Sequence, residues 1–93
     1  MARKEFSADK ANKELLEAFR KTIIDLKQAS RLKQKSIAEK SGLDHRYLQN
    51  LLSVKEIHNP SLDTMYKLVK AFNISLAELS ENITKNYNSE DKH

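Results

Sequence analysis

Apolar residues along this chain recur at steps of three and four positions, the spacing that gathers side chains on one face of an α-helix. The first such stripe consists of Leu15, Leu16, Phe19, Ile23 and Leu26. It predicts an amphipathic helix from about Ala8 to about Ala29, with Ser7 or Asp9 as its N-cap.

The same periodicity predicts four shorter helices, over about residues 34–40, 45–53, 62–72 and 75–85. The helix over 62–72 has the strongest apolar face, formed by Leu62, Met65, Leu68, Val69 and Phe72. Ser61 can cap its start, and Asn73 can adopt the left-handed conformation that ends a helix. Ser75 and Glu78 have capping-box spacing and open the last helix. The inward-facing residues of that helix are expected to be Leu76, Leu79 and Ile83.

These elements predict an all-α fold, a compact five-helix bundle in a single domain with its core over about residues 8–85. With one Gly, one Pro and 39 % hydrophobic residues, the composition favours helices over strands. The polar ends, 1–7 and 86–93, are expected to be flexible because they offer few apolar side chains for burial.

Residues 34–53 have the pattern of a helix-turn-helix, the unit that sets a short second helix into the major groove of DNA. Ala38 is small where the two helices cross, and Gly42 suits the turn because glycine tolerates positive φ. Asp44 can cap the second helix. That helix is anchored from beneath by Leu48 and Leu51. Its outer face carries the hydrogen-bonding side chains His45, Arg46, Gln49 and Asn50.

Charge is distributed unevenly and is most positive around this motif. From Arg20 to Lys55, nine basic residues stand against three acidic ones, which makes this segment +6 in a chain of net charge +4. Residues 56–93 carry −2. A basic surface can neutralise phosphates, although a solvated Lys-rich helix face would have the same composition. The coincidence with the motif favours the nucleic-acid interpretation.

Several other classes of protein are disfavoured. Without Cys there is no disulfide and no Cys-ligated zinc, and His58 and His93 have no second ligand at a helical or hairpin spacing, so no metal or cofactor is expected. No apolar run is long enough for a membrane span, so we expect a cytoplasmic protein with no membrane partner. The absence of paired carboxylates, a Ser/His/Asp set and a Gly-rich phosphate loop argues against an enzyme.

Further residues around the motif complete a longer pattern. They are Gln34, Ile37, Ala38, Gly42, Leu43, Tyr47, Leu48, the run Asn59-Pro60-Ser61-Leu62, the run Asn73-Ile74-Ser75-Leu76, and Leu79. The pattern spans about Leu16 to Leu79 and resembles the lambda/434 repressor and Cro-like (XRE-type) family of helix-turn-helix proteins. The resemblance implies a bundle of four or five helices and a dimeric, DNA-binding regulator of bacterial or phage type at the nucleoid.

The resemblance also implies roles for individual residues. Contacts with base edges are expected from His45, Arg46, Gln49 and Asn50. Contacts with phosphates, which give affinity and register but no sequence information, are expected from Lys33, Gln34, Lys35, Tyr47, Lys55 and Asn59. Tyr47 is expected to pack at the edge of the core with its hydroxyl on a phosphate. Arg46 suits guanine, whereas Gln49 or Asn50 suits adenine.

Members of this family usually dimerise through their C-terminal helices, which implies an interface containing Phe72, Leu76, Leu79 and Ile83. Leu15 and Phe19 on the first helix form a second candidate surface. A two-fold dimer would read an inverted-repeat operator. The leading function is therefore a sequence-specific repressor or autoregulator. The alternative is a protein-interaction module on the same fold, antitoxin-like or specific for an unidentified partner, with little reading of DNA sequence.

Four features depart from the usual pattern of the family, and those at Leu52 and Val54 keep that alternative open. Leu52 stands where members commonly carry Glu paired with a basic residue of the first helix, and it is expected to pack into the core instead. Val54 stands near a common Gly position, and the loop to Pro60 is longer than the commonest form. Lys33 is a poor N-cap where Ser or Thr is favoured.

Overall fold

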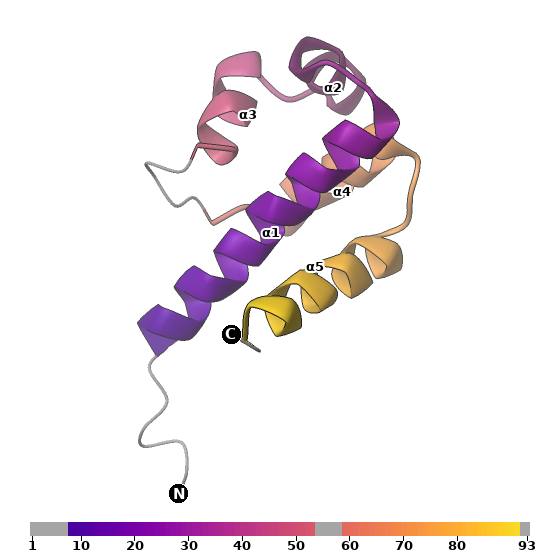
Figure 1. Ribbon diagram of the computed structural model, residues 1–93. Coiled ribbons are helices and arrows are strands. Elements are labelled where there is room, and N and C mark those ends of the chain that lie inside the picture. The colour runs from indigo at the N-terminus through magenta and orange to yellow at the C-terminus, as the bar shows by residue number, and fades with distance from the viewer. Residues whose placement is uncertain (1–7, 54–58, 92–93) are drawn as a thin grey trace, which may run out of the picture.

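The computed structural model of the protein describes residues 8–53 and 59–91, with side chains described over 13–53 and 59–88. Five helices make up this part of the chain, namely α1 (Ala8–Ser30), α2 (Gln34–Ser41), α3 (His45–Leu51), α4 (Leu62–Phe72) and α5 (Leu76–Asp91). The described residues contain no strand, so the fold is all-α, as predicted (Figure 1).

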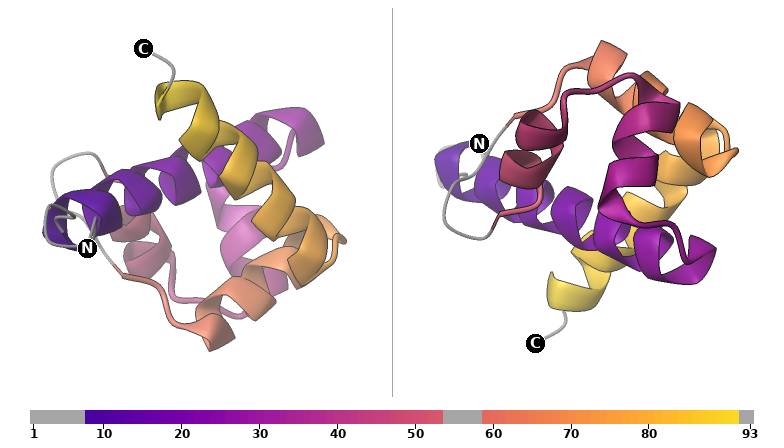
Figure 2. Two further views of the ribbon diagram at one scale, coloured as in Figure 1. Left: turned by 90° about the horizontal axis from the view of Figure 1, so that it is seen from below. Right: turned by 90° about the horizontal axis from the view of Figure 1, so that it is seen from above.

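The long helix α1 runs diagonally through the molecule, and the other helices pack around it (Figure 1). Its most extensive partner is α5, whereas α2 packs mainly against α4. The pair α2 and α3 lies on one side of α1 and α5 lies on the other (Figures 1 and 2). This arrangement leaves the outer surfaces of α2 and α3 uncovered by the remaining helices.

The core lies where the apolar faces of all five helices meet. Each helix contributes at least one side chain with no more than 1 % of its surface exposed: Ile23, Ile37, Leu48, Leu68 and Leu79. A chain of this length can bury only a modest core, so each of these residues carries a large share of its stability. No helix in the described part of the chain combines the length and the apolar composition needed to cross a membrane.

The residues predicted to begin and end α4 and to begin α5 form the expected caps. Asn73 adopts the left-handed conformation with φ 59° at the end of α4, and the Ser61 hydroxyl accepts a hydrogen bond from the Thr64 N–H at 3.1 Å at its start. Ser75 caps α5 in the same way, through the Glu78 N–H at 3.0 Å. Each of these contacts joins residues within one helical turn of each other in the chain, so the sequence alone predicts them.

The end of α1 contains another residue in the left-handed conformation, and the sequence did not predict this one. Arg31 has φ 61°, and its N–H donates to the Gln28 carbonyl at 3.3 Å. The Ser30 hydroxyl donates to the Lys27 carbonyl at 3.1 Å and accepts from the Leu32 N–H at 3.3 Å. The serine thereby supports a bend that an arginine rarely adopts by itself.

The last helix extends further than its apolar periodicity predicts. It continues past Lys85 to Asp91, so residues 86–91 are helical rather than part of a loose tail. Thr22 of α1, which is 1 % exposed, accepts a hydrogen bond from the Asn86 side-chain amide at 2.7 Å and donates to the Ala18 carbonyl at 2.7 Å. The part-buried hydrogen bond from Asn86 links α5 beyond Lys85 to α1. The expectations for residues 1–7 and 92–93 lie outside the described residues.

Candidate nucleic-acid interface

The turn between α2 and α3 is held by hydrogen bonds from both backbone and side chain. Gly42 has φ 78°, and its N–H donates to the Ala38 carbonyl at 2.9 Å. This confirms the predicted left-handed glycine. The buried Ser41 hydroxyl donates to the same carbonyl at 3.2 Å and accepts from the Leu43 N–H at 3.2 Å. Ser41 was not among the residues predicted to form the turn; its signal in the sequence is a hydroxyl residue directly before a helix-ending glycine.

The helix α3 is fixed from its start and from beneath. The Asp44 carboxylate accepts hydrogen bonds from the Arg46 N–H at 3.1 Å and the Tyr47 N–H at 3.2 Å, as a predicted N-cap should. Leu48 and Leu51 are 0 % and 3 % exposed and pack into the core. Because both ends of this short helix are held, its rotation about its own axis is determined.

That rotation turns the four predicted base-contacting residues outward. His45, Arg46, Gln49 and Asn50 are all exposed. None of the four side chains forms a hydrogen bond or ion pair with a residue that the structure describes. Their donors and acceptors therefore face solvent and are available to an external partner.

Three of the six predicted phosphate-contacting residues lie at the start of α2. Lys33 is its N-cap residue, is exposed and makes no capping hydrogen bond, as expected, yet the helix still begins at Gln34. Gln34 is half-buried and Lys35 is exposed. The first turn of α2 contains no acidic residue, so its free N–H groups and the two lysines produce a positive potential there. Asn59 is exposed, and Lys55 lies outside the described residues.

Tyr47 and Leu52 lie on the buried flank of α3. The Tyr47 side chain is half-buried, and its hydroxyl oxygen lies 3.4 Å from Oγ1 of Thr64 on α4. Leu52 is half-buried and packs against the core, which confirms the interpretation of this departure from the family pattern. Val54 and His58 lie outside the described residues.

The predicted dimer-interface residues differ in how much surface they retain. Leu79 is 1 % exposed and belongs to the core of its own chain, so it has no surface for a second copy. Phe72, Leu76 and Ile83 are half-buried and pack against the same core. Leu15 on α1 is 46 % exposed.

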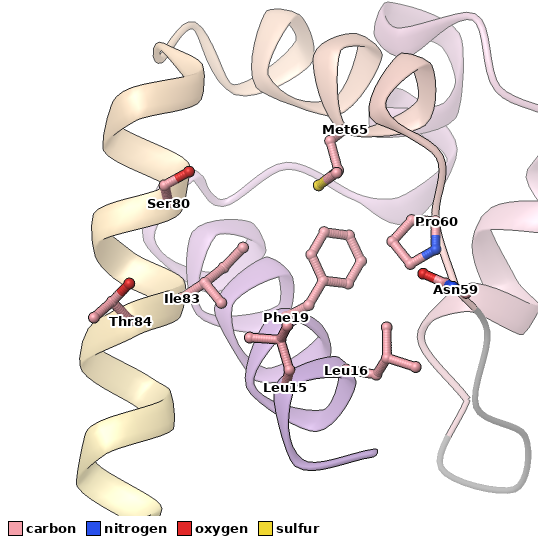
Figure 3. Close-up of a pocket in the computed structure, with 9 residues that line it drawn as sticks. All are labelled: Leu15, Leu16, Phe19, Asn59, Pro60, Met65, Ser80, Ile83 and Thr84. Carbon is pink, nitrogen blue, oxygen red and sulfur yellow. The ribbon is translucent and has the colours of Figure 1, made fainter. Parts of the chain in front are cut away.

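Ile83 and Leu15 meet in one apolar groove of about 290 Å³ (Figure 3). The groove lies between α1, the start of α4 and α5, and its other lining residues are Leu16, Phe19, Asn59, Pro60, Met65, Ser80 and Thr84. Carbon atoms dominate its walls, with the Phe19 ring at the centre and the Ser80 and Thr84 hydroxyls on the α5 side (Figure 3). The groove is thus a mainly apolar surface, separate from the outer face of α3.

Comparison with known proteins identifies the family. A family model described as helix-turn-helix matches residues 23–79, which include α2, α3 and α4 and more than half of the chain. Neither the curated proteins nor the solved structures that were searched contain a match. The matched region coincides with the turn, the anchored α3 and the core around them. The chain therefore belongs to the lambda repressor-like (XRE-type) helix-turn-helix family, a family of DNA-binding domains.

Proposed function

We propose that this protein is a sequence-specific transcriptional regulator that inserts α3 into the major groove of an operator. The observation that carries the proposal is the outer face of α3, where four exposed hydrogen-bonding side chains have no partner among the described residues. A helix held from beneath by Leu48 and Leu51 presents these side chains in a constant orientation. Direct reading of base edges requires such an orientation, because each base pair is recognised by the position of its donors and acceptors.

The chemistry of these side chains suits double-stranded DNA. The Arg46 guanidinium can donate two parallel hydrogen bonds to the O6 and N7 atoms of guanine. The Gln49 or Asn50 amide can both donate to and accept from adenine. His45, at the start of α3, would contact a neighbouring base. Lys33, Gln34, Lys35 and Asn59 would then bind the phosphates on either side and set the register.

Replacing Lys35 with alanine is expected to weaken binding to specific and random duplexes alike. One phosphate contact is lost, so the slope of the logarithm of the association constant against the logarithm of salt concentration should decrease by about one. Fluorescence titrations over about 50–200 mM salt would measure it. Lys85→Ala is the matched control, because Lys85 is an exposed lysine on α5, across α1 from α2. Equal changes of slope in both variants would contradict the assignment of the phosphate-binding surface.

A repressor of this size is proposed to act as a homodimer on an inverted repeat, with two recognition helices about 34–36 Å apart. Since Leu79 is committed to the core, we place the dimer interface at the groove that contains Leu15 and Ile83. A second copy would remove this apolar surface from water. As a transcriptional regulator, the protein would act in the cytoplasm of a bacterial cell.

Replacing Leu15 with glutamate is expected to raise the dimer dissociation constant about ten-fold. The substitution puts a charged carboxylate where an apolar side chain would be buried in the dimer, and removing that charge from water is unfavourable. Sedimentation equilibrium over a range of protein concentrations would measure the shift. Leu62→Glu serves as the control, since Leu62 is 67 % exposed and does not line the groove. If both variants associate as the wild type does, the interface lies elsewhere.

The proposed function is tested by titrating the protein with DNA from upstream of its own gene and with a scrambled duplex, at about 50 and 200 mM salt. Tighter binding to the upstream DNA that persists at the higher salt would support a sequence-reading autoregulator. Weak, equal binding that disappears with salt would overturn the proposal and favour a protein-interaction module.

A further inference from the structure

We propose that the buried Thr64 hydroxyl and the Ser61 hydroxyl behind it orient the Tyr47 hydroxyl, so that the phosphate contact expected of Tyr47 is made by a donor that points away from α4. The inference rests on the proposed function and deepens it, since it assigns positioning roles to Thr64 of α4 and to Ser61, the N-cap residue of α4. We call Ser61, Thr64 and Tyr47 the hydroxyl chain. It connects the recognition helix to the start of α4.

The hydroxyl chain is a continuous series of side-chain contacts. The Ser61 hydroxyl accepts from the Thr64 N–H at 3.1 Å and donates to Thr64 Oγ1 at 3.1 Å. Thr64 Oγ1 lies 3.4 Å from the Tyr47 hydroxyl oxygen, and in that contact either atom could be the donor. Ser61 therefore donates its single hydroxyl proton to Thr64, and the hydroxyl proton of Thr64 still needs an acceptor.

Burial decides where the Thr64 proton goes. Thr64 is only 7 % exposed, so water has little access to its hydroxyl. Among the described residues, the Tyr47 oxygen is the remaining acceptor that this hydroxyl contacts. If Tyr47 were the donor, the Thr64 proton would be buried without an acceptor, which is unfavourable. Thr64 therefore donates to Tyr47, and the phenolic proton of Tyr47 points away from α4.

The position of Tyr47 favours a phosphate rather than a base as the acceptor. Tyr47 lies on the flank of α3, between the buried Leu48 and Leu51 and the exposed Asn50, and it faces the start of α4. The exposed Asn59, a predicted phosphate contact, lies two residues before Ser61. A donor on the flank of a helix in the major groove faces the sugar-phosphate backbone, whereas the outer face of the helix meets the bases. A neutral hydroxyl adds affinity there without displacing a counterion.

The inference is tested by a double-mutant cycle of Tyr47→Phe and Thr64→Val on binding to a mixed-sequence DNA duplex. Tyr47→Phe should weaken binding about ten-fold with an unchanged salt slope, unlike the loss of a lysine. Thr64→Val should weaken binding about three-fold although Thr64 is buried, and it should add nothing in the Tyr47→Phe background. Thr64→Ser, which keeps the hydroxyl, should restore the wild-type affinity.

Tyr66→Phe is the matched control, because Tyr66 is a tyrosine of α4 that is 51 % exposed and lies outside the hydroxyl chain. Circular dichroism melting of each variant separates lost stability from lost binding. Wild-type affinity in Tyr47→Phe would overturn the inference while leaving the proposed function intact. Additive losses in the cycle would overturn the positioning roles of Thr64 and Ser61. Failure of the wild type to bind any duplex would instead overturn the proposed function itself.

Discussion

Replacing Arg46 with alanine is expected to remove about 1–3 kcal/mol of binding free energy at the specific operator while leaving binding to random DNA nearly unchanged. The Arg46 side chain is exposed, and its guanidinium is bound to no described residue, so the mutation disturbs the free protein little. The expected loss is that of the paired hydrogen bond proposed between Arg46 and a guanine, which only the correct sequence offers. The effect is measured by parallel titrations against the operator and a scrambled duplex.

Arg46→Lys is the informative control for this prediction. Lysine keeps the positive charge but lacks the planar fork that donates two parallel hydrogen bonds. It should therefore retain binding to random DNA and recover only part of the specific affinity. If Arg46→Ala weakened binding to both duplexes equally, Arg46 would be a phosphate contact and the face of α3 that reads bases would have been assigned wrongly.

Replacing Leu48 with alanine is expected to lower the free energy of unfolding by about 2–5 kcal/mol. Leu48 is 0 % exposed and is one of the two leucines through which α3 is anchored in the core. Truncation leaves a cavity that the surrounding helices fill only partly. For a domain of this size the midpoint of thermal unfolding should fall by at least about 10 °C. Chemical and thermal denaturation followed by circular dichroism would measure both quantities.

Leu62→Ala provides the matched comparison, because it removes the same atoms from a leucine that is 67 % exposed. Its free energy of unfolding should stay within about 0.5 kcal/mol of the wild type. Similar destabilisation by the two substitutions would show that α3 is not held by Leu48. Because Leu48 also determines the orientation of the outer face, the folded fraction of Leu48→Ala should lose specific DNA binding more than random binding.

The local elements of this protein are determined by the sequence itself. The helix α4 begins after Ser61 and ends before Asn73, as predicted, and Gly42 and Asp44 form the predicted turn and cap. Each of these signals acts between residues within about one helical turn, so no knowledge of the rest of the fold is needed. The exposure of the outer face of α3 follows likewise, because the burial of Leu48 and Leu51 determines the helical phase.

The tertiary structure decided which partner each apolar or polar surface meets. Periodicity marked Leu79 as part of an apolar face, but only the packing of the helices made it a core residue rather than an interface residue. The hydrogen bond between Asn86 and Thr22 joins residues 64 positions apart and extends α5 through a polar segment. Likewise, Tyr47 and Thr64 lie 17 positions apart. Side-chain contacts over such separations have no local pattern in the sequence, because they exist only once the helices have packed.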